Sequence, residues 1–148
     1  MKKQITFILF ILLASVLVFN SGNSNLISVS DVDLGPNSIL VKLTASNGLV
    51  TLSTTTGLIF YVGDGTSDAT INFAGTLADV NSALNGLTFT PTPGYNGPAS
   101  LEIVSDDQGF SGSGSAQTDT DQISITVRPI NPVVTSVNSS SSDGLYKI

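Results

Sequence analysis

The sequence predicts an all-β protein, and three observations carry this prediction. Charged residues make up only 11% of the chain, while Ser, Thr, Asn and Gly are abundant, a composition common in secreted β proteins. Turn residues such as Pro93-Gly94 separate short runs of β-prone residues. Within these runs apolar residues recur at every second position, which places them on one buried face of a sheet. The alternating sets are Leu87 and Phe89, then Leu101 and Ile103, then Ile123, Ile125 and Val127.

Earlier in the chain, four further strand segments are expected. Residues 39–46 and 49–53 are β-prone and flank Asn47-Gly48, a dipeptide that predicts a β-hairpin with a type I′ turn. Residues 58–62 indicate a short strand, and the glycines around Asp64 indicate a turn. Ala69, Ile71 and Phe73 then alternate as another strand.

One short helix is expected between the strands, because the apolar period changes there. Leu77, Val80, Leu84 and Leu87 are spaced by three and four residues. Thr76 can cap the helix together with Asp79, and Gly86 stands where a left-handed stop belongs. We interpret this helix as a crossover that covers the core.

The first residues have the layout of a secretory signal peptide. Lys2 and Lys3 precede an apolar run of 15 residues from Ile5 to Phe19, which is shorter than the roughly 20 residues needed to span a bilayer. We therefore expect a signal peptide over residues 1–24, processing after Ser24, and no stable membrane span after its removal. In the alternative interpretation, residues 16–19 form the first strand of the domain.

The pieces ISVSDVDLG, SNGLVTLSTTTGLIFYVGDGTSDATINFAG, TLADVNSALNGLTFTPTPGYNGPASLEI and SDDQG, followed by TDTDQISITV, occur in this order between Ile27 and Val127. This segment resembles a cadherin-like repeat of the kind found in tandem in large bacterial surface and biofilm adhesion proteins. The resemblance implies a Greek-key cadherin/Ig-like β-sandwich of about seven strands with one short crossover helix. It also implies a secreted or cell-surface spacer or adhesion module, often with calcium at its ends.

This resemblance organises the chain into three parts. We expect the signal peptide at 1–24, the cadherin-like repeat at 25–131, and a linker with the truncated start of a further module at 132–148. Arg128-Pro129-Ile130-Asn131-Pro132 has the composition of a linker. The expected partners are neighbouring repeat modules or a cell-surface protein or glycan.

Charge and residue types exclude several functions. The formal net charge is −6, and loss of Lys2 and Lys3 with a leader leaves three basic against eleven acidic residues, or −8. Such a surface repels nucleic acid and attracts cations. The chain has no Cys and no His, so thiolate zinc sites and Ser-His or Cys-His triads are excluded. We therefore predict that the protein is not an enzyme.

The acidic residues at strand ends are the candidate metal ligands. In an extended segment, residues i and i+2 point to the same side, so Asp31 with Asp33, and Asp119 with Asp121, each offer two carboxylates in one direction. Calcium accepts 6 to 8 oxygen ligands with loose geometry, which suits such corners better than it suits magnesium. The predicted metal residues are Asp31, Asp33, Asp106, Asp107, Asp119 and Asp121.

By similarity to cadherin-like repeats, Asp31, Asp33 and Asp106 would converge at one end of the sandwich and share calcium with a preceding module. The family's Asn-Asp pair before the next Pro is replaced here by Asn131-Pro132, so the carry-over is partial. In the alternative interpretation these aspartates cap turns through bonds to backbone amides. Asp64, Asp68 and Asp79 are expected to be turn and cap residues.

A carbohydrate-binding module is the competing function. Tyr61, Tyr95 and Phe110 are the candidate stacking residues, and a coplanar, exposed arrangement of Tyr61 and Tyr95 would favour it. A glycosidase would need two acids across a cleft that aromatic residues usually line. The chain has no Trp, which argues against that reaction.

Overall fold

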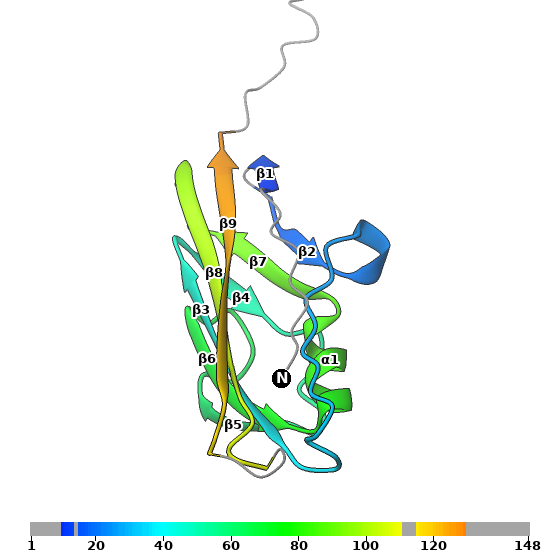
Figure 1. Ribbon diagram of the computed structural model, residues 1–148. Helices are drawn as coiled ribbons and strands as arrows, with labels where there is room; N and C mark the ends of the chain where they lie inside the picture. The colour runs from blue at the N-terminus through cyan, green and yellow to red at the C-terminus, as the bar shows by residue number, and fades with distance from the viewer. Residues whose placement is uncertain (1–9, 14, 111–114, 130–148) are drawn as a thin grey trace, which may run out of the picture.

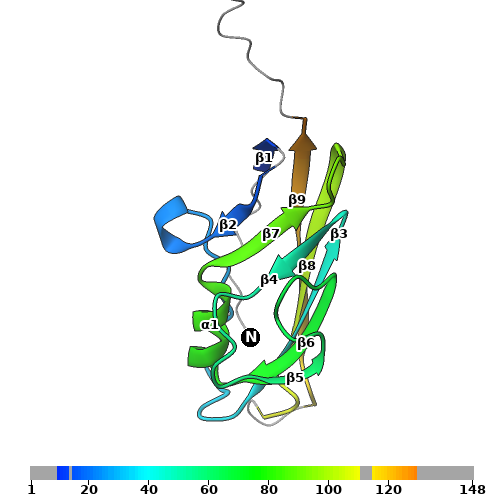
Figure 2. The same ribbon diagram turned by 180° about the vertical axis from the view of Figure 1, so that it is seen from behind.

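The computed structural model describes residues 10–13, 15–110 and 115–129, which form two facing sheets and one short helix. Figures 1 and 2 show the layers edge-on: the larger sheet forms one layer, and the smaller sheet with the helix forms the other. This arrangement confirms the predicted fold class, a β-sandwich with one short helix.

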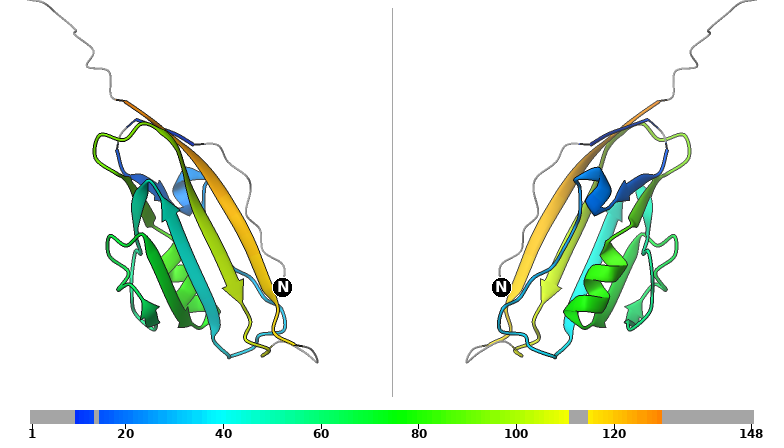
Figure 3. Two further views of the ribbon diagram at one scale, coloured as in Figure 1. Left: turned by 90° about the vertical axis from the view of Figure 1, so that its left-hand side faces the viewer. Right: turned by 90° about the vertical axis from the view of Figure 1, so that its right-hand side faces the viewer.

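The larger sheet has six strands in the order β1-β9-β8-β3-β6-β5. All neighbours in it are antiparallel except β1, which runs parallel to β9. Its long strands follow the long axis of the molecule, as Figure 3 shows. The strands are β1 (Phe10–Leu13), β9 (Thr118–Arg128), β8 (Gly97–Asp106), β3 (Ile39–Ser46), β6 (Thr70–Gly75) and β5 (Ile59–Val62).

The smaller sheet has three antiparallel strands in the order β2-β7-β4. They are β2 (Leu17–Phe19), β7 (Leu87–Pro91) and β4 (Gly48–Thr51), and a 3₁₀ turn, η1 (Ser21–Asn23), follows β2. The described residues thus contain nine strands, where about seven were expected. The two at the N-terminus, β1 and β2, lie within the predicted signal peptide, and β2 falls where the alternative interpretation places a first strand.

The core lies between the sheets and is built from the alternating residues that the sequence indicates. The residues at positions 87, 89, 101, 103, 123, 125 and 127 are all buried. The rings of Phe73 in β6 and Phe60 in β5 pack in a tilted arrangement, with centroids 5.9 Å apart and an interplanar angle of 39°. The core is therefore aliphatic with a few phenylalanines, and its largest fully buried side chains include Phe19, Phe73 and Phe89.

The helix α1 (Leu77–Leu84) begins and ends as predicted. The Thr76 hydroxyl accepts a hydrogen bond from the Asp79 backbone N–H at 3.2 Å, and Gly86 has a φ of 106°. Val80, Ala83 and Leu84 are buried against the sandwich. Among the described residues, no helix has the length and apolar character to cross a bilayer.

The predicted hairpin at Asn47-Gly48 is wrong. β3 pairs with β6 and β8 in the larger sheet, whereas β4 pairs with β7 in the smaller one, so the chain changes sheets here. Asn47 has a φ of 54°, but Gly48 has no positive φ, so the turn is not type I′. Gly48 is needed for space instead, because a Cβ there would lie 2.3 Å from the Phe89 ring.

Candidate functional site

The turn over residues 31–38 and the β8–β9 loop lie together at one end of the sandwich, which we call the acidic end. Both segments are at the bottom of Figure 1, opposite the end where β9 finishes. A hydrogen bond joins them, since the Gln108 Nε2 donates to the Ser38 backbone oxygen at 3.2 Å. Leu40, at the start of β3, is also paired with Asp106, at the end of β8.

Asp31 is the most unusual side chain at this end. It is only 9% exposed, and its Oδ1 accepts a hydrogen bond from the Asp33 backbone N–H at 3.0 Å, which closes an Asx turn. Its Oδ2 is buried and has no hydrogen-bond partner within the described residues. The Oδ1 therefore acts as the turn interpretation expects. The unsatisfied Oδ2 is the oxygen that is left for a metal ion.

Asp107 holds the β8–β9 loop closed. The side chain is fully buried, and its Oδ1 accepts hydrogen bonds from the backbone N–H groups of Gly109 at 2.8 Å and Gln117 at 2.7 Å. Its own N–H donates to the Gln117 backbone oxygen at 3.1 Å. The carboxylate thus joins both sides of the loop from inside.

The neighbouring Asp106 has a smaller role at the surface. Its Oδ1 accepts a hydrogen bond from the Gln108 backbone N–H at 2.7 Å, and Gln108 has a left-handed φ of 56°. This Asx turn starts the loop. Adjacent carboxylates thus serve one loop, one at its surface and one in its interior.

Asp119 and Asp121 lie on the same side of β9, as their spacing predicts. They are paired with Ser105 and Ile103 of β8, and they continue the inward-facing row of Ile123. Both are partly buried, whereas Asp33 is exposed. Of the six predicted residues, the structure therefore places Asp31, Asp33, Asp106 and Asp107 in the two adjoining turns, and Asp119 and Asp121 on the first part of β9.

These carboxylates do not form a ready-made metal cage. Among residues 10–13, 15–110 and 115–129, no group of three or more His, Cys, Asp or Glu side chains is close enough to hold a metal ion. The donor type suits calcium, and the unsatisfied Asp31 Oδ2 is an atom that a cation would satisfy. Any ion would have to draw the two turns closer together.

The remaining aspartates are turn and cap residues, as expected. The Asp68 Oδ2 accepts from the N–H groups of Asp64 at 3.0 Å and Gly65 at 2.9 Å, and the Asp64 Oδ1 accepts from Thr66 at 2.9 Å. The Asp79 carboxylate accepts from the Thr76 hydroxyl at 2.7 Å, at the start of α1.

The three candidate stacking residues lie in separate places. Tyr61 is on edge strand β5 and is 61% exposed, and Phe110, in the β8–β9 loop, is 52% exposed. Tyr95 lies in the β7–β8 loop, packs against the core, and donates its hydroxyl to the Pro98 backbone oxygen at 2.6 Å. Tyr61 and Tyr95 therefore do not form one coplanar platform.

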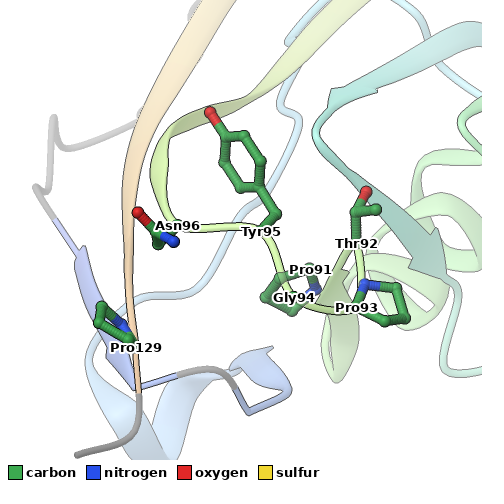
Figure 4. A pocket seen from close by; sticks show the side chains of 7 residues that line it. All are labelled: Pro91, Thr92, Pro93, Gly94, Tyr95, Asn96 and Pro129. Carbon is green, nitrogen blue, oxygen red and sulfur yellow. The ribbon is translucent and has the colours of Figure 1, made fainter.

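Tyr95 borders a hollow of about 270 Å³ at the end of the molecule where β9 finishes, which we call the exit end. Figure 4 shows the loop side chains around it, with Pro129 across from Asn96. The lining residues are Pro91, Thr92, Pro93, Gly94, Tyr95, Asn96 and Pro129.

A second hollow, of about 360 Å³, lies on the outer face of the larger sheet and is lined by Leu40, Tyr61, Asn72 and Gln108. Within it, the Asn72 Oδ1 is buried and has no hydrogen-bond partner in the described part of the chain. Asn72 is not among the residues that the sequence pattern indicates as functional. A signal was present, because an amide stands between the apolar Ile71 and Phe73 in strand β6.

Comparisons with known proteins add no relative: a scan against protein-family models, a search of curated proteins and a search of solved structures each found no significant match. What is shown is a β-sandwich, and the likeness to cadherin-like repeats depends on the sequence motifs alone.

Proposed function

We propose that this chain is a secreted or cell-surface structural and adhesion module whose acidic end is stiffened by calcium. The observation that carries the proposal is the buried, unsatisfied Asp31 Oδ2 at the end opposite to the one where β9 finishes. In a tandem array, the exit end would face the following module, because β9 finishes there. The partners would then be neighbouring modules, or a protein or glycan of the cell surface.

Calcium would act through charge and order. Asp31 and Asp33 on one turn and Asp106 and Asp107 on the other would supply oxygens, with Asp119 and Asp121 beside them on β9. The ion would neutralise carboxylates that otherwise repel one another and would satisfy the buried Asp31 oxygen. Because it would bind the folded form preferentially, it would raise the stability of the module. The proposed role is mechanical, and catalysis has no part in it.

The test is thermal unfolding of the full chain in EDTA, in millimolar calcium and in millimolar magnesium. We expect calcium, and not magnesium, to raise the unfolding temperature by several degrees. Asp31→Asn keeps the Asx turn acceptor and removes the charge, so the calcium effect should be lost. Asp64→Asn is the matched control, because Asp64 also accepts one backbone N–H in a turn. An unchanged unfolding temperature in calcium would contradict calcium binding.

Glycan binding is the second candidate, and the hollow lined by Tyr61 and Asn72 favours it. The exposed Tyr61 ring offers a sugar an apolar platform, and the amide side chain beside it offers a polar group. A glycan array probed with the full chain tests this function. Tyr61→Ala should abolish any binding, whereas Tyr95→Phe, at the exit end, should retain it. Binding that survives Tyr61→Ala would exclude this hollow as the site.

A further inference from the structure

Residues 17–25 contribute to the core, although they overlap the predicted signal peptide. Phe19 is 0% exposed and belongs to the largest fully buried side chains of the molecule. Its strand, β2, pairs antiparallel with β7, with Leu17 opposite Phe89 and Phe19 opposite Leu87. β2 therefore covers one edge of the smaller sheet and supplies one of its large core residues.

A backbone hydrogen bond connects β2 to Gly86, the glycine that follows α1. The Gly86 N–H donates to the Phe19 backbone oxygen at 2.7 Å, directly after α1. This short bond connects segments 67 positions apart in the sequence, since it joins residues 19 and 86. Phe19 therefore supplies a backbone acceptor for the connection between α1 and β7.

Asn25 forms a clasp over the end of β2. It is 6% exposed, its Nδ2 donates to the Val18 backbone oxygen at 2.8 Å, and its Oδ1 accepts from the Asn20 N–H at 2.9 Å. Asn23 adds a second donor to the same Val18 oxygen at 3.1 Å. The amide of Asn25 is thus satisfied on both sides by residues that precede it.

Processing after Ser24 would remove every one of these partners. The buried Asn25 amide would lose both of its bonds, the β7 edge would become unpaired, and the core would lose a phenylalanine. A buried polar group without partners destabilises a domain substantially, and so does the cavity left by a missing phenylalanine side chain. β1 is different, because it adds an outermost strand beyond β9 at the edge of the larger sheet.

We infer that residues 17–25 belong to the mature, folded domain, and that any leader peptidase cuts on the N-terminal side of Leu17. The inference about cleavage rests on the proposed secretion. The step is hydrolysis: water adds its hydroxyl to the carbonyl carbon of one peptide bond, the C–N bond breaks, and the new α-amino group takes the proton. The released leader would leave β2, η1 and the Asn25 clasp intact.

The first arm of the test is export of the full chain, with a C-terminal tag, from a bacterial host. N-terminal sequencing and intact mass of the exported protein should give a first residue at or before Leu17. A first residue anywhere from Val18 to Asn25 would overturn the inference. If the chain is not exported, the proposed secretion fails, and the second arm still decides whether residues 17–25 are part of the folded domain.

The second arm is thermal unfolding of the full chain and its variants. Phe19→Ala should lower the unfolding temperature by roughly 10–20 °C, because it empties a fully buried site in a small domain. Leu26→Ala is the matched control and should leave the temperature nearly unchanged, since Leu26 is 40% exposed. Equal, small effects of the two substitutions would show that β2 is dispensable, and would overturn the inference.

Discussion

The two ends of this sandwich hold their loops by different chemistry. At the acidic end, carboxylates accept hydrogen bonds from backbone amides: Asp107 closes the β8–β9 loop from inside, and Asp31 closes a turn of its own. At the exit end, Pro91 ends β7 and Pro93 lies in the β7–β8 loop, where Tyr95 packs on the core and donates to the Pro98 oxygen. One end is ordered by charge, and the other by ring constraint and apolar contact.

This contrast predicts which end of the molecule can respond to ionic conditions. A loop held by prolines and a tyrosine has little reason to change with ionic conditions. A loop held by carboxylates has fixed negative charge beside it, and one buried oxygen at that end is still unsatisfied. We therefore expect ions to affect the loops at the acidic end, and we expect the β7–β8 loop at the exit end to be rigid and insensitive to ions.

Among substitutions at the two ends, the largest expected effect comes from Asp107→Ala. The carboxylate is fully buried and makes two hydrogen bonds with backbone N–H groups, each worth about 1.5–3 kcal/mol because the acceptor is charged. We expect the free energy of unfolding to fall by about 3 kcal/mol, measured by urea denaturation. A loss below 1 kcal/mol would mean that the loop does not depend on this carboxylate.

A smaller effect is expected at the exit end from Tyr95→Phe. The substitution removes the 2.6 Å hydrogen bond to the Pro98 oxygen and keeps the packing of the ring. The free energy of unfolding should fall by about 1 kcal/mol. The fall should be the same in EDTA and in calcium. A calcium-dependent difference would contradict the separation of the two ends.

The smallest effect is expected from Asp106→Ala, next to the most sensitive position. Asp106 accepts one bond, from the Gln108 N–H, at the surface of the loop. Surface substitutions of this kind change stability by about 0.5 kcal/mol or less, and urea denaturation should show a loss in that range. If Asp106→Ala matched Asp107→Ala, burial would not be what distinguishes the two carboxylates.

Much of the fold could be predicted because its core follows a two-residue period. The alternation at Leu101 and Ile103, or at Ile123 and Ile125, is a local pattern that identifies which side chains of the strand face the core. The cap of α1 was equally readable, since Thr76 and Asp79 interact across three residues. These features depend on residues that are close together in the sequence, so a local pattern is enough to predict them.

What failed depended on distant residues. Asn47-Gly48 has the composition of a tight hairpin, but the ring of Phe89 packs where a Cβ of residue 48 would lie, and the chain crosses to the other sheet. The apolar character of residues 17–19 indicates a leader as well as a strand, and only the contact with β7 distinguishes the two. The unsatisfied oxygens of Asp31 and Asn72 likewise depend on which segments cover them.

The edge strand β5 has a consequence for behaviour in solution. Its sequence, Ile59-Phe60-Tyr61-Val62, is uncharged, and Ile59, Tyr61 and Val62 are each about half exposed or more. Such an edge invites strand-to-strand association between copies. The register with β6 shifts between Phe60 and Val62, and an irregularity of this kind twists a strand away from a straight partner. The irregularity should therefore oppose edge-to-edge association, and a substitution that straightened β5 is expected to cause aggregation at high concentration.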